Sequence, residues 1–208
     1  MIGATWWSRR RTRTGSVSVP GDHGVLGDPP PDGDDLLRRV ALGEAAALEE
    51  LYHRHGPALF GYLVRLCGDR MSAEEILQDT LLAVWRSAAT FEGRAGARAW
   101  LFGVARRQAY QRLRLRTVPV PVEPPEISDP APGPEELAIL AAGGTEVATA
   151  VAGLPVHHRE VIGLALVAEL PLAEVAELLG IPVGTVKSRL HHARAALVRA
   201  LTAREIRQ

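Results

Sequence analysis

The stretch from Thr117 to Pro134 divides the chain into two folding units. It is rich in proline, carries acidic residues and contains no basic residue. A segment of this composition lacks the apolar side chains that pack a core, and it favours extended polyproline conformations. We therefore expect a flexible linker over 117–134, with one small helical domain before it and another after it.

Composition allows each of these domains a core of its own, because hydrophobic residues make up 47% of the 208 residues. Residues 1–33 are rich in glycine and proline and lack helical or strand periodicity, which predicts an unstructured leader. No apolar run reaches the roughly 20 residues that cross a bilayer, so we expect no membrane insertion. A single cysteine, Cys67, excludes an internal disulfide framework and suits a reducing cytoplasm.

Helical periodicity dominates residues 34–116. Apolar residues share one face over Leu48–Leu66, across Gly56-Pro57, which predicts a kinked or broken helix. The stretch Ser72–Glu75 has the pattern of a capping box at the start of a second helix. A third helix is expected to carry the apolar residues of Trp100–Leu113. Together these helices predict a small bundle.

Residues 135–208 are expected to form the second helical domain, which contains the spacing of a helix-turn-helix. Ala176 is small where two helices must cross, and Gly180 suits the left-handed conformation of the turn. The pairs Leu154-Pro155 and Leu170-Pro171 predict helix starts, where proline costs little. The two helices of the motif are expected to share a core made of Leu179, Ile181, Val186 and Leu190.

The second helix of this motif presents cationic and hydroxyl side chains, with no acidic residue between Ile181 and Leu201. Phosphates bind cations and hydroxyl or amide donors, while Arg and Lys that reach the groove can pair with guanine. The alternative is a helical hairpin with a solvated basic side. We expect six residues of the exposed face to meet DNA: Thr185, Lys187, Ser188, Arg189, His192 and Arg194.

A second basic stretch runs from Arg94 to Arg116, again without an acidic residue. Aromatic residues are interleaved with its arginines, a mixture typical of surfaces that hold unstacked bases. Two basic surfaces on two tethered domains predict two contacts with DNA. For Trp100, packing in the core is a competing interpretation, and for the whole stretch a solvated helix face is another.

The sequence contains no Gly-rich phosphate loop with its lysine, no HExxH pair and no Gly-x-Ser-x-Gly elbow. The pairs His53/His55, His157/His158 and His191/His192 lack recurrent metal-ligand spacing and a cysteine cluster, so we expect exposed polar histidines. We therefore expect neither a metal nor a cofactor, and a chain that is not an enzyme. A metal-dependent nuclease is the enzymatic alternative, and the sequence offers no metal cluster for it.

Four segments resemble the extracytoplasmic-function (ECF) sigma factors of bacterial RNA polymerase, of the sigma-70 type. The stretch Leu179–Arg194 resembles their promoter-binding helix-turn-helix, and Leu154–Val161 resembles the opening of that domain. The stretches Ala73–Trp85 and Trp100–Arg106 are similar to their polymerase-binding and promoter-opening segments. The resemblance covers about 34–201 and implies an all-α fold, with a region-two bundle and a region-four helix-turn-helix joined by the linker.

The resemblance implies a cytoplasmic factor that binds core RNA polymerase and directs promoter recognition, DNA melting and transcription initiation. The helix-turn-helix domain would read the minus-thirty-five element and touch the polymerase flap, and an anti-sigma factor would be a further partner. The clamp helices of the largest polymerase subunit would contact Glu75, Gln78, Asp79, Leu82, Trp85 and Arg86. The minus-ten element would contact Arg94, Arg98, Trp100, Arg106, Arg107, Tyr110, Gln111 and Arg114.

Two positions depart from the usual family pattern, which has Asn at the place of Arg107 and Asp at the place of Gln111. A family preference for one minus-ten sequence therefore does not carry over. The main alternative is a stand-alone helix-turn-helix regulator that binds DNA as a dimer without polymerase. That alternative leaves the arginine and aromatic residues of the first domain unexplained, and it requires a palindromic site.

Overall fold

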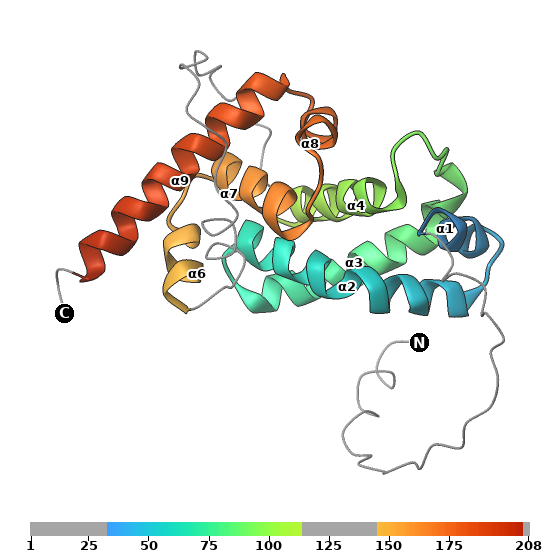
Figure 1. Cartoon of the computed structure of the whole chain (residues 1–208). Helices are drawn as coiled ribbons and strands as arrows, with labels where there is room; N and C mark the ends of the chain where they lie inside the picture. The colour runs from blue at the N-terminus through green and yellow to red at the C-terminus, as the bar shows by residue number, and fades with distance from the viewer. Residues whose placement is uncertain (1–32, 114–144, 206–208) are drawn as a thin grey trace, which may run out of the picture. The chain divides into compact units, whose positions relative to one another are not determined.

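The computed structural model describes residues 33–113 and 145–205, and these residues form two groups of helices without a strand. Residues 1–32 of the predicted leader, the predicted linker and Arg114 lie outside these residues, whereas Gly33 begins the first helix. The first lobe contains α1 (Gly33–Ala41), α2 (Ala45–Cys67), α3 (Arg70–Ser87), the short η1 (Ala88–Thr90) and α4 (Ala97–Arg112) (Figure 1). The second lobe contains α6 (Thr145–Ala152), α7 (Val156–Ile162), the π-helical turn η2 (Gly163–Val167), α8 (Leu172–Leu179) and α9 (Val183–Glu205).

The longest helix of the first lobe, α2, is continuous through Pro57, so the predicted break is wrong. Proline removes one backbone hydrogen bond, but Leu51, Leu59 and Leu63 are all buried on the same helix and hold both halves against the core. Gly56 lets the Tyr52 ring lie close against the helix, because a Cβ there would lie 2.8 Å from that ring. The stability that α2 gains by packing its apolar face exceeds the cost of the backbone hydrogen bond that Pro57 removes.

The helix that follows, α3, begins at Arg70, before the predicted cap Ser72. Asp69 has extended backbone angles, and its Oδ1 accepts a hydrogen bond of 2.7 Å from the Ser72 N–H. Asp69 is therefore the N-cap, and the predicted capping box headed by Ser72 is wrong. A carboxylate at this position satisfies a free backbone donor and is favourable at the positive end of the helix dipole.

The turn between α8 and α9 has the conformation that the sequence predicts. Gly180 has φ 67° and ψ 35°, in the left-handed region, and the Ile181 N–H donates to the Ala176 carbonyl at 3.0 Å. Pro155 and Pro171 stand directly before α7 and α8 as their N-caps. Val186 and Ala176 are buried in the shared core, as expected from the motif. The helix-turn-helix is therefore confirmed.

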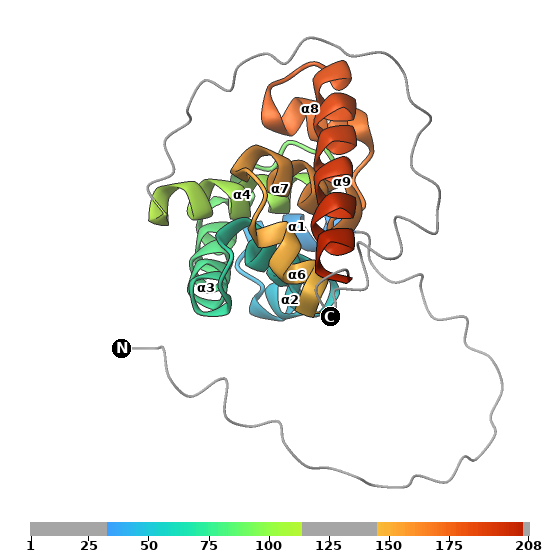
Figure 2. The same ribbon diagram turned by 90° about the vertical axis from the view of Figure 1, so that its left-hand side faces the viewer.

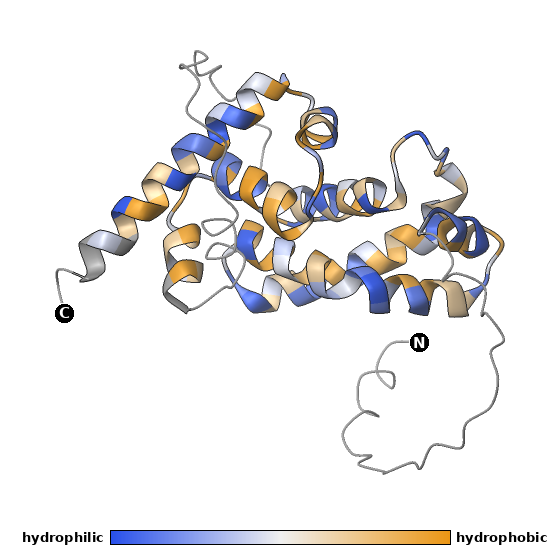
Figure 3. Ribbon diagram, in the orientation of Figure 1, coloured by the Kyte–Doolittle hydropathy of each residue, from blue (hydrophilic) through white to orange (hydrophobic). Residues whose placement is uncertain are grey.

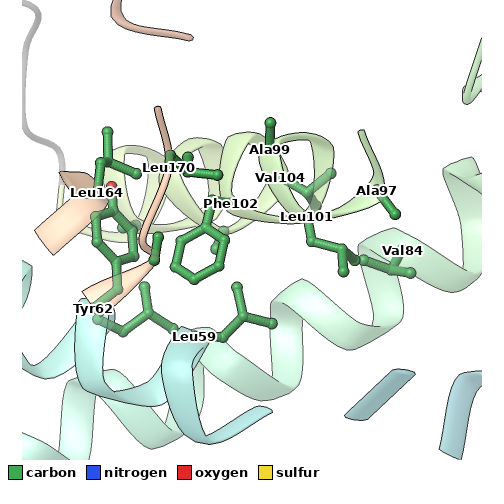
Figure 4. Close-up of a cluster of buried hydrophobic side chains, with 14 of the residues drawn as sticks. Leu59, Tyr62, Val84, Ala97, Ala99, Leu101, Phe102, Val104, Leu164 and Leu170 are labelled. Atoms are coloured by element: carbon green, nitrogen blue, oxygen red, sulfur yellow. The ribbon is translucent and has the colours of Figure 1, made fainter. Parts of the chain in front are cut away.

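One apolar core runs through both lobes. Leu164 and Leu170 of the second lobe lie close to Tyr62 and Phe102 of the first, and all four are buried (Figure 4). Both views of the ribbon place α7 beside α2 and α4 (Figures 1 and 2). Figure 3 shows η2 as largely apolar, whereas polar segments recur along the first half of α9. The sequence did not predict this packing between the lobes.

Within 33–113 and 145–205, no helix combines the length and the apolar character required to span a bilayer.

One histidine of the first lobe is buried, in contrast to the expectation that the paired histidines are exposed. His55 is 8% exposed, and its Nε2 has no hydrogen-bond partner within the described ranges. Burial, followed by the positive charges of Arg98 and Arg54, lowers the pKa of His55 to about 4. The imidazole is therefore neutral in the folded protein, since its protonated form would be desolvated beside two cations.

The free energy of unfolding is expected to fall as the pH drops below about 6.5, because the unfolded chain then binds a proton at His55 that the folded chain does not. Stability from this group is complete above the unfolded pKa and is lost progressively down to pH 4. Between pH 7 and pH 5 the loss should be about 2 kcal/mol. Urea unfolding of the native chain and of His55→Gln at both pH values measures it. An equal loss in the variant would contradict the assignment to His55.

Candidate nucleic-acid interface

The helix-turn-helix presents a cationic side chain at the start of α9. Lys187 is exposed, one position after the buried Val186 that anchors the helix. Thr185, His192 and Arg194 are half-buried on the same helix. The four residues lie along one helix whose first turns are held by α8, so a rigid element carries them. Helices mounted in this way can enter a major groove.

Two of the residues expected on this exposed face are buried. Ser188 is 9% exposed and Arg189 is 6% exposed. The helical period accounts for Arg189, since it falls three residues after Val186 and four before Ala193, which are both fully buried. The prediction that Ser188 and Arg189 lie on the outer face is therefore wrong. Both side chains would have to become exposed before they could contact DNA.

Four histidines connect α7 with α9. The His158 and His192 rings stack with centroids 6.5 Å apart, and each has a histidine neighbour in sequence, His157 and His191. His158 is buried, which again differs from the expected exposure. Across the described ranges, no group of three or more His, Cys, Asp or Glu residues is arranged to hold a metal ion.

Aromatic and arginine side chains pair along α4 and the loop before it. The Phe91 and Trp100 rings meet edge to face with centroids 5.8 Å apart, and the Arg106 guanidinium lies 4.6 Å from the centre of the Tyr110 ring. Trp100 is half-buried, so it both packs on the lobe and reaches its surface. Arg94, Arg107 and Gln111 are exposed, and Arg94 is paired with Glu92. This surface has the composition that stacks on bases and binds phosphates.

Two arginines of this surface are paired with carboxylates of the second lobe. Arg106 Nε donates to Glu160 Oε1 at 2.6 Å, and Arg98 lies 3.4 Å from Glu169. Glu160 is almost fully buried, with 4% of its side chain exposed. Burial acts to lower the pKa of Arg106, but the charge and hydrogen bond of Glu160 outweigh it and raise that pKa. The Arg106 guanidinium therefore keeps its charge in the folded chain.

The outer face of α3 combines polar groups with exposed apolar ones. Leu82 is 54% exposed and Trp85 is 39% exposed. Glu75, Gln78 and Arg86 are exposed, and Asp79 is half-buried. A single face of one helix thus carries two large apolar side chains within a polar rim, which is the composition of a protein interface.

An open hollow of about 310 Å³ joins this face to α4. Arg112 of α4 reaches back to α3, where it donates to Asp79 at 2.9 Å and also pairs with Glu75. The hollow is lined by residues of both helices: Asp79, Leu82, Ala83, Arg86, Ser87, Val104, Arg107 and Gln108. Asp79, Leu82 and Arg86 belong to the expected polymerase contacts, and Arg107 belongs to the expected minus-ten contacts.

Sequence reasoning missed three residues that organise these surfaces. Asp34 of α1 accepts a hydrogen bond of 2.7 Å from the Ala97 N–H and so fixes the start of α4 from 63 residues away. Glu160 pairs with Arg106, and Arg112 connects α4 to α3. No local pattern marks such partners, because each contact joins distant parts of the chain. The only available signal was the absence of acidic residues within 94–116, which leaves its arginines to find partners elsewhere.

Comparison with protein families matches both lobes. The family described as Sigma-70 region 2 matches residues 51–117, and the family described as Sigma-70, region 4 matches residues 145–197. The first match contains α3 and α4, and the second contains the helix-turn-helix. Both family matches therefore fall on the surfaces described above.

Individual proteins and structures agree with these matches. The chain is 37% identical to the ECF RNA polymerase sigma factor SigL of Mycobacterium tuberculosis over 160 residues, which cover 76% of this chain and 90% of SigL. It is 30% identical to the ECF RNA polymerase sigma factor RpoE of Cereibacter sphaeroides over 148 residues, which cover 71% of this chain and 82% of RpoE.

Two solved structures resemble the fold. CnrH, in complex with the cytosolic domain of CnrY, matches with a TM-score of 0.61 and 27% identity, covering 82% of this chain and 97% of CnrH. The sigma factor RpoE of Bartonella quintana, in complex with the anti-sigma factor NepR, matches with a TM-score of 0.56 and 26% identity, covering 74% and 96%. With two family regions in order and relatives of this similarity, the chain belongs to the ECF group of the sigma-70 family of RNA polymerase sigma factors.

Proposed function

We propose that this chain binds core RNA polymerase and directs it to promoters, where it recognises two DNA elements and opens the duplex. The observation that supports this proposal most is the presence of both sigma regions on one chain, each with a cationic surface on a helix. Chemistry on nucleotides belongs to the polymerase, and the chain itself acts as a binding protein without a cofactor. Its place of action is the cytoplasm, where the polymerase works.

The second lobe is proposed to bind the minus-thirty-five element through α9. Within the proposed set Lys187 is an exposed cation, while Thr185, His192 and Arg194 are half-buried on the same helix. Ser188 and Arg189 belong to this set only if their buried side chains are released. Cations and hydroxyls on a helix in the major groove set both the register and the base contacts.

The first lobe is proposed to bind and open the minus-ten element. Arg94, Arg107 and Gln111 are exposed along α4 and its preceding loop, and Arg98, Trp100, Arg106 and Tyr110 are half-buried beside them. Arg114 completes the proposed set from outside the described residues. Aromatic and guanidinium faces hold unstacked bases by stacking, which favours the opened strand over the duplex.

Protein partners are proposed for α3 and for the sigma factor as a whole. The clamp helices of the largest polymerase subunit would cover Glu75, Gln78, Asp79, Leu82, Trp85 and Arg86, and the flap would contact the second lobe. Of the two solved relatives, RpoE is in complex with an anti-sigma factor and CnrH with the cytosolic domain of CnrY. We extend the first of these associations to this chain, so an anti-sigma factor is a proposed partner.

Run-off transcription tests the proposal. Core polymerase with the purified chain, on a library of genomic promoter fragments, should initiate at sites that core polymerase alone does not use. A stand-alone helix-turn-helix regulator would instead bind a palindrome without polymerase and leave start sites unchanged. The family assignment does not favour that alternative, and start sites that do not change on addition of the chain would refute the proposal.

Replacement of Lys187 by Ala should reduce the salt dependence of promoter binding. Each phosphate that a cation neutralises releases counterions, so loss of one contact should lower the slope of log K against log salt by about 0.9. The measurement is a salt titration of the binding of the polymerase complex to a promoter found by run-off transcription. Arg199→Ala is the matched control, because Arg199 is an exposed cation of α9 outside the proposed set. Equal slopes for the native chain and Lys187→Ala would remove Lys187 from the interface.

A further inference from the structure

The hollow between α3 and α4 is formed by one face of each helix. On α3 the lining residues recur every three or four positions, which is the spacing of a single helical face: Asp79, Leu82, Ala83, Arg86 and Ser87. The opposite wall on α4 has the same spacing: Val104, Arg107 and Gln108. The two helices lie side by side in both views, so each wall belongs to a packed helix (Figures 1 and 2).

The hollow combines apolar side chains with two unpaired cations. Val104 is only 4% exposed and lies at its base, and Leu82 and Ala83 line it from α3. Arg86 and Arg107 are both exposed, one on each helix. Across the described ranges, no hydrogen bond or ion pair holds either guanidinium. Two free positive charges therefore stand on opposite walls above an apolar base.

The acidic residue among the described lining residues does not balance these cations. Asp79 Oδ2 accepts a hydrogen bond of 2.9 Å from Arg112, which also pairs with Glu75. Ser87 offers no free donor or charge, because its hydroxyl donates to the Ala83 carbonyl of its own helix at 2.6 Å. Within the described residues, the hollow therefore carries excess positive charge and has room for an anionic partner.

An acidic side chain on an aliphatic stem fits this combination better than a DNA phosphate does. Guanidinium groups bind carboxylates through charge-assisted hydrogen bonds, which are frequently bidentate. The methylene groups of a glutamate would also cover Leu82 and Ala83, whereas a phosphate has no apolar part to bury against them. Gln108 is half-buried in the α4 wall and adds an amide donor. The chemistry of the hollow thus favours a protein as its occupant.

The position of the hollow indicates which protein. Its α3 wall contains Asp79, Leu82 and Arg86 of the proposed polymerase surface, so the hollow extends that surface onto α4. Arg107 stands where the usual family pattern has Asn, so the α4 wall carries a cation that the usual pattern lacks. This departure gives the present chain the second of the two charges.

We propose that the hollow seats one acidic side chain of core RNA polymerase, held between Arg86 and Arg107. The inference rests on the proposed function, because that function makes the polymerase the partner of α3. It adds a protein contact to Arg107, which the proposed function places only in the minus-ten set. Arg107 thereby becomes a residue that determines how tightly this chain binds its polymerase, and the polymerase must supply a carboxylate opposite it.

Replacement of Arg107 tests the seat in the absence of DNA. Arg107→Asn restores the usual family residue, and its affinity for core polymerase should be at least about tenfold weaker than that of the native chain. Arg107→Lys keeps the charge but loses the planar fork, so its affinity should lie between those two. Arg107→Glu brings two carboxylates together and should weaken binding by about 100-fold. Arg107 is exposed, so circular dichroism should show a native fold in all three.

The rates of binding distinguish a seated carboxylate from attraction at a distance. A contact that forms on docking acts mainly on dissociation, whereas a charge at the rim of an interface acts on association. Surface plasmon resonance over immobilised core polymerase should show dissociation at least about tenfold faster for Arg107→Asn, with association within about twofold of native. Arg86→Gln should show the same pattern from the α3 wall. Arg38→Asn is the matched control, because Arg38 is an exposed arginine of α1 outside the hollow, and it should dissociate at the native rate.

Three results would overturn the seat. The first is native dissociation for both Arg107→Asn and Arg86→Gln. The second is slower association alone, since the two arginines would then only attract the polymerase. The third is native affinity of Arg107→Asn for the polymerase with weaker promoter binding by the complex, which would assign Arg107 to DNA. Failure of the proposed function gives a different result, because the native chain itself would then neither bind core polymerase nor change its start sites.

Discussion

Phe102→Ala is expected to lower the free energy of unfolding by about 3–5 kcal/mol. The Phe102 side chain is fully buried, and it packs edge to face against Tyr62 at a ring distance of 5.4 Å. Figure 4 shows it among apolar residues of α2 and of the second lobe. Its removal leaves a cavity that rigid neighbours cannot fill, so the loss of transfer energy and the cavity act together. Urea unfolding followed by circular dichroism measures the change.

Phe60→Ala is the matched control for this substitution. Phe60 is half-buried on α2, and its ring is covered from outside by the Arg70 guanidinium at 4.9 Å from the ring centre. Solvent can fill the space that its removal leaves, so the expected loss is only about 1 kcal/mol. Equal losses for the two phenylalanines would show that Phe102 does not lie in the shared core.

Local patterns were sufficient to predict the helices and the turn of the second lobe. Gly180 adopts the left-handed conformation of the turn because glycine has no Cβ to strain the backbone at φ 67°, and Pro155 and Pro171 precede helices because proline needs no N–H there. The family matches and the relatives then confirmed an ECF sigma factor. Each of these features depends on residues that are near one another in sequence, which explains why they were predictable.

Features that depend on distant residues were not predictable from the sequence. The continuity of α2 through Pro57 depends on packing of its apolar face against other helices, and a proline in isolation indicates a break. The outer face of α9 was predicted from residue types, which placed Arg189 outside although its helical position puts it beside Val186 and Ala193. The ion pair between Arg106 and Glu160 joins positions 54 residues apart across the two lobes. No periodicity encodes such a pair.

The proposed polymerase and DNA surfaces are physically connected through Arg112. This side chain of α4 pairs with Glu75 and Asp79 of α3, and those acids belong to the proposed polymerase set. All three groups are substantially exposed, so each ion pair contributes little to stability. The two ion pairs instead orient the side chains of Glu75 and Asp79 on α3 toward α4 before a partner binds.

Leu82→Glu is expected to weaken the affinity for core RNA polymerase by about 100-fold. Leu82 is 54% exposed beside Trp85, so the free chain should fold normally with a charge at this position. In the complex, the same carboxylate would be buried without a partner at the centre of the proposed interface. Substitution of such central apolar residues typically costs about 2–4 kcal/mol of binding free energy, which corresponds to a factor of about 30 to 1,000. Fluorescence anisotropy of a labelled chain titrated with core polymerase measures the affinity.

Leu42→Glu separates this effect from a general effect of a new surface charge. Leu42 follows α1, is 81% exposed and lies outside the proposed polymerase surface, so the same substitution there should leave the affinity within about twofold of the native value. The two variants have the same net charge and the same loss of an exposed leucine. A difference between them therefore reports the position on α3, and equal affinities would mean that the polymerase binds this sigma factor through another face.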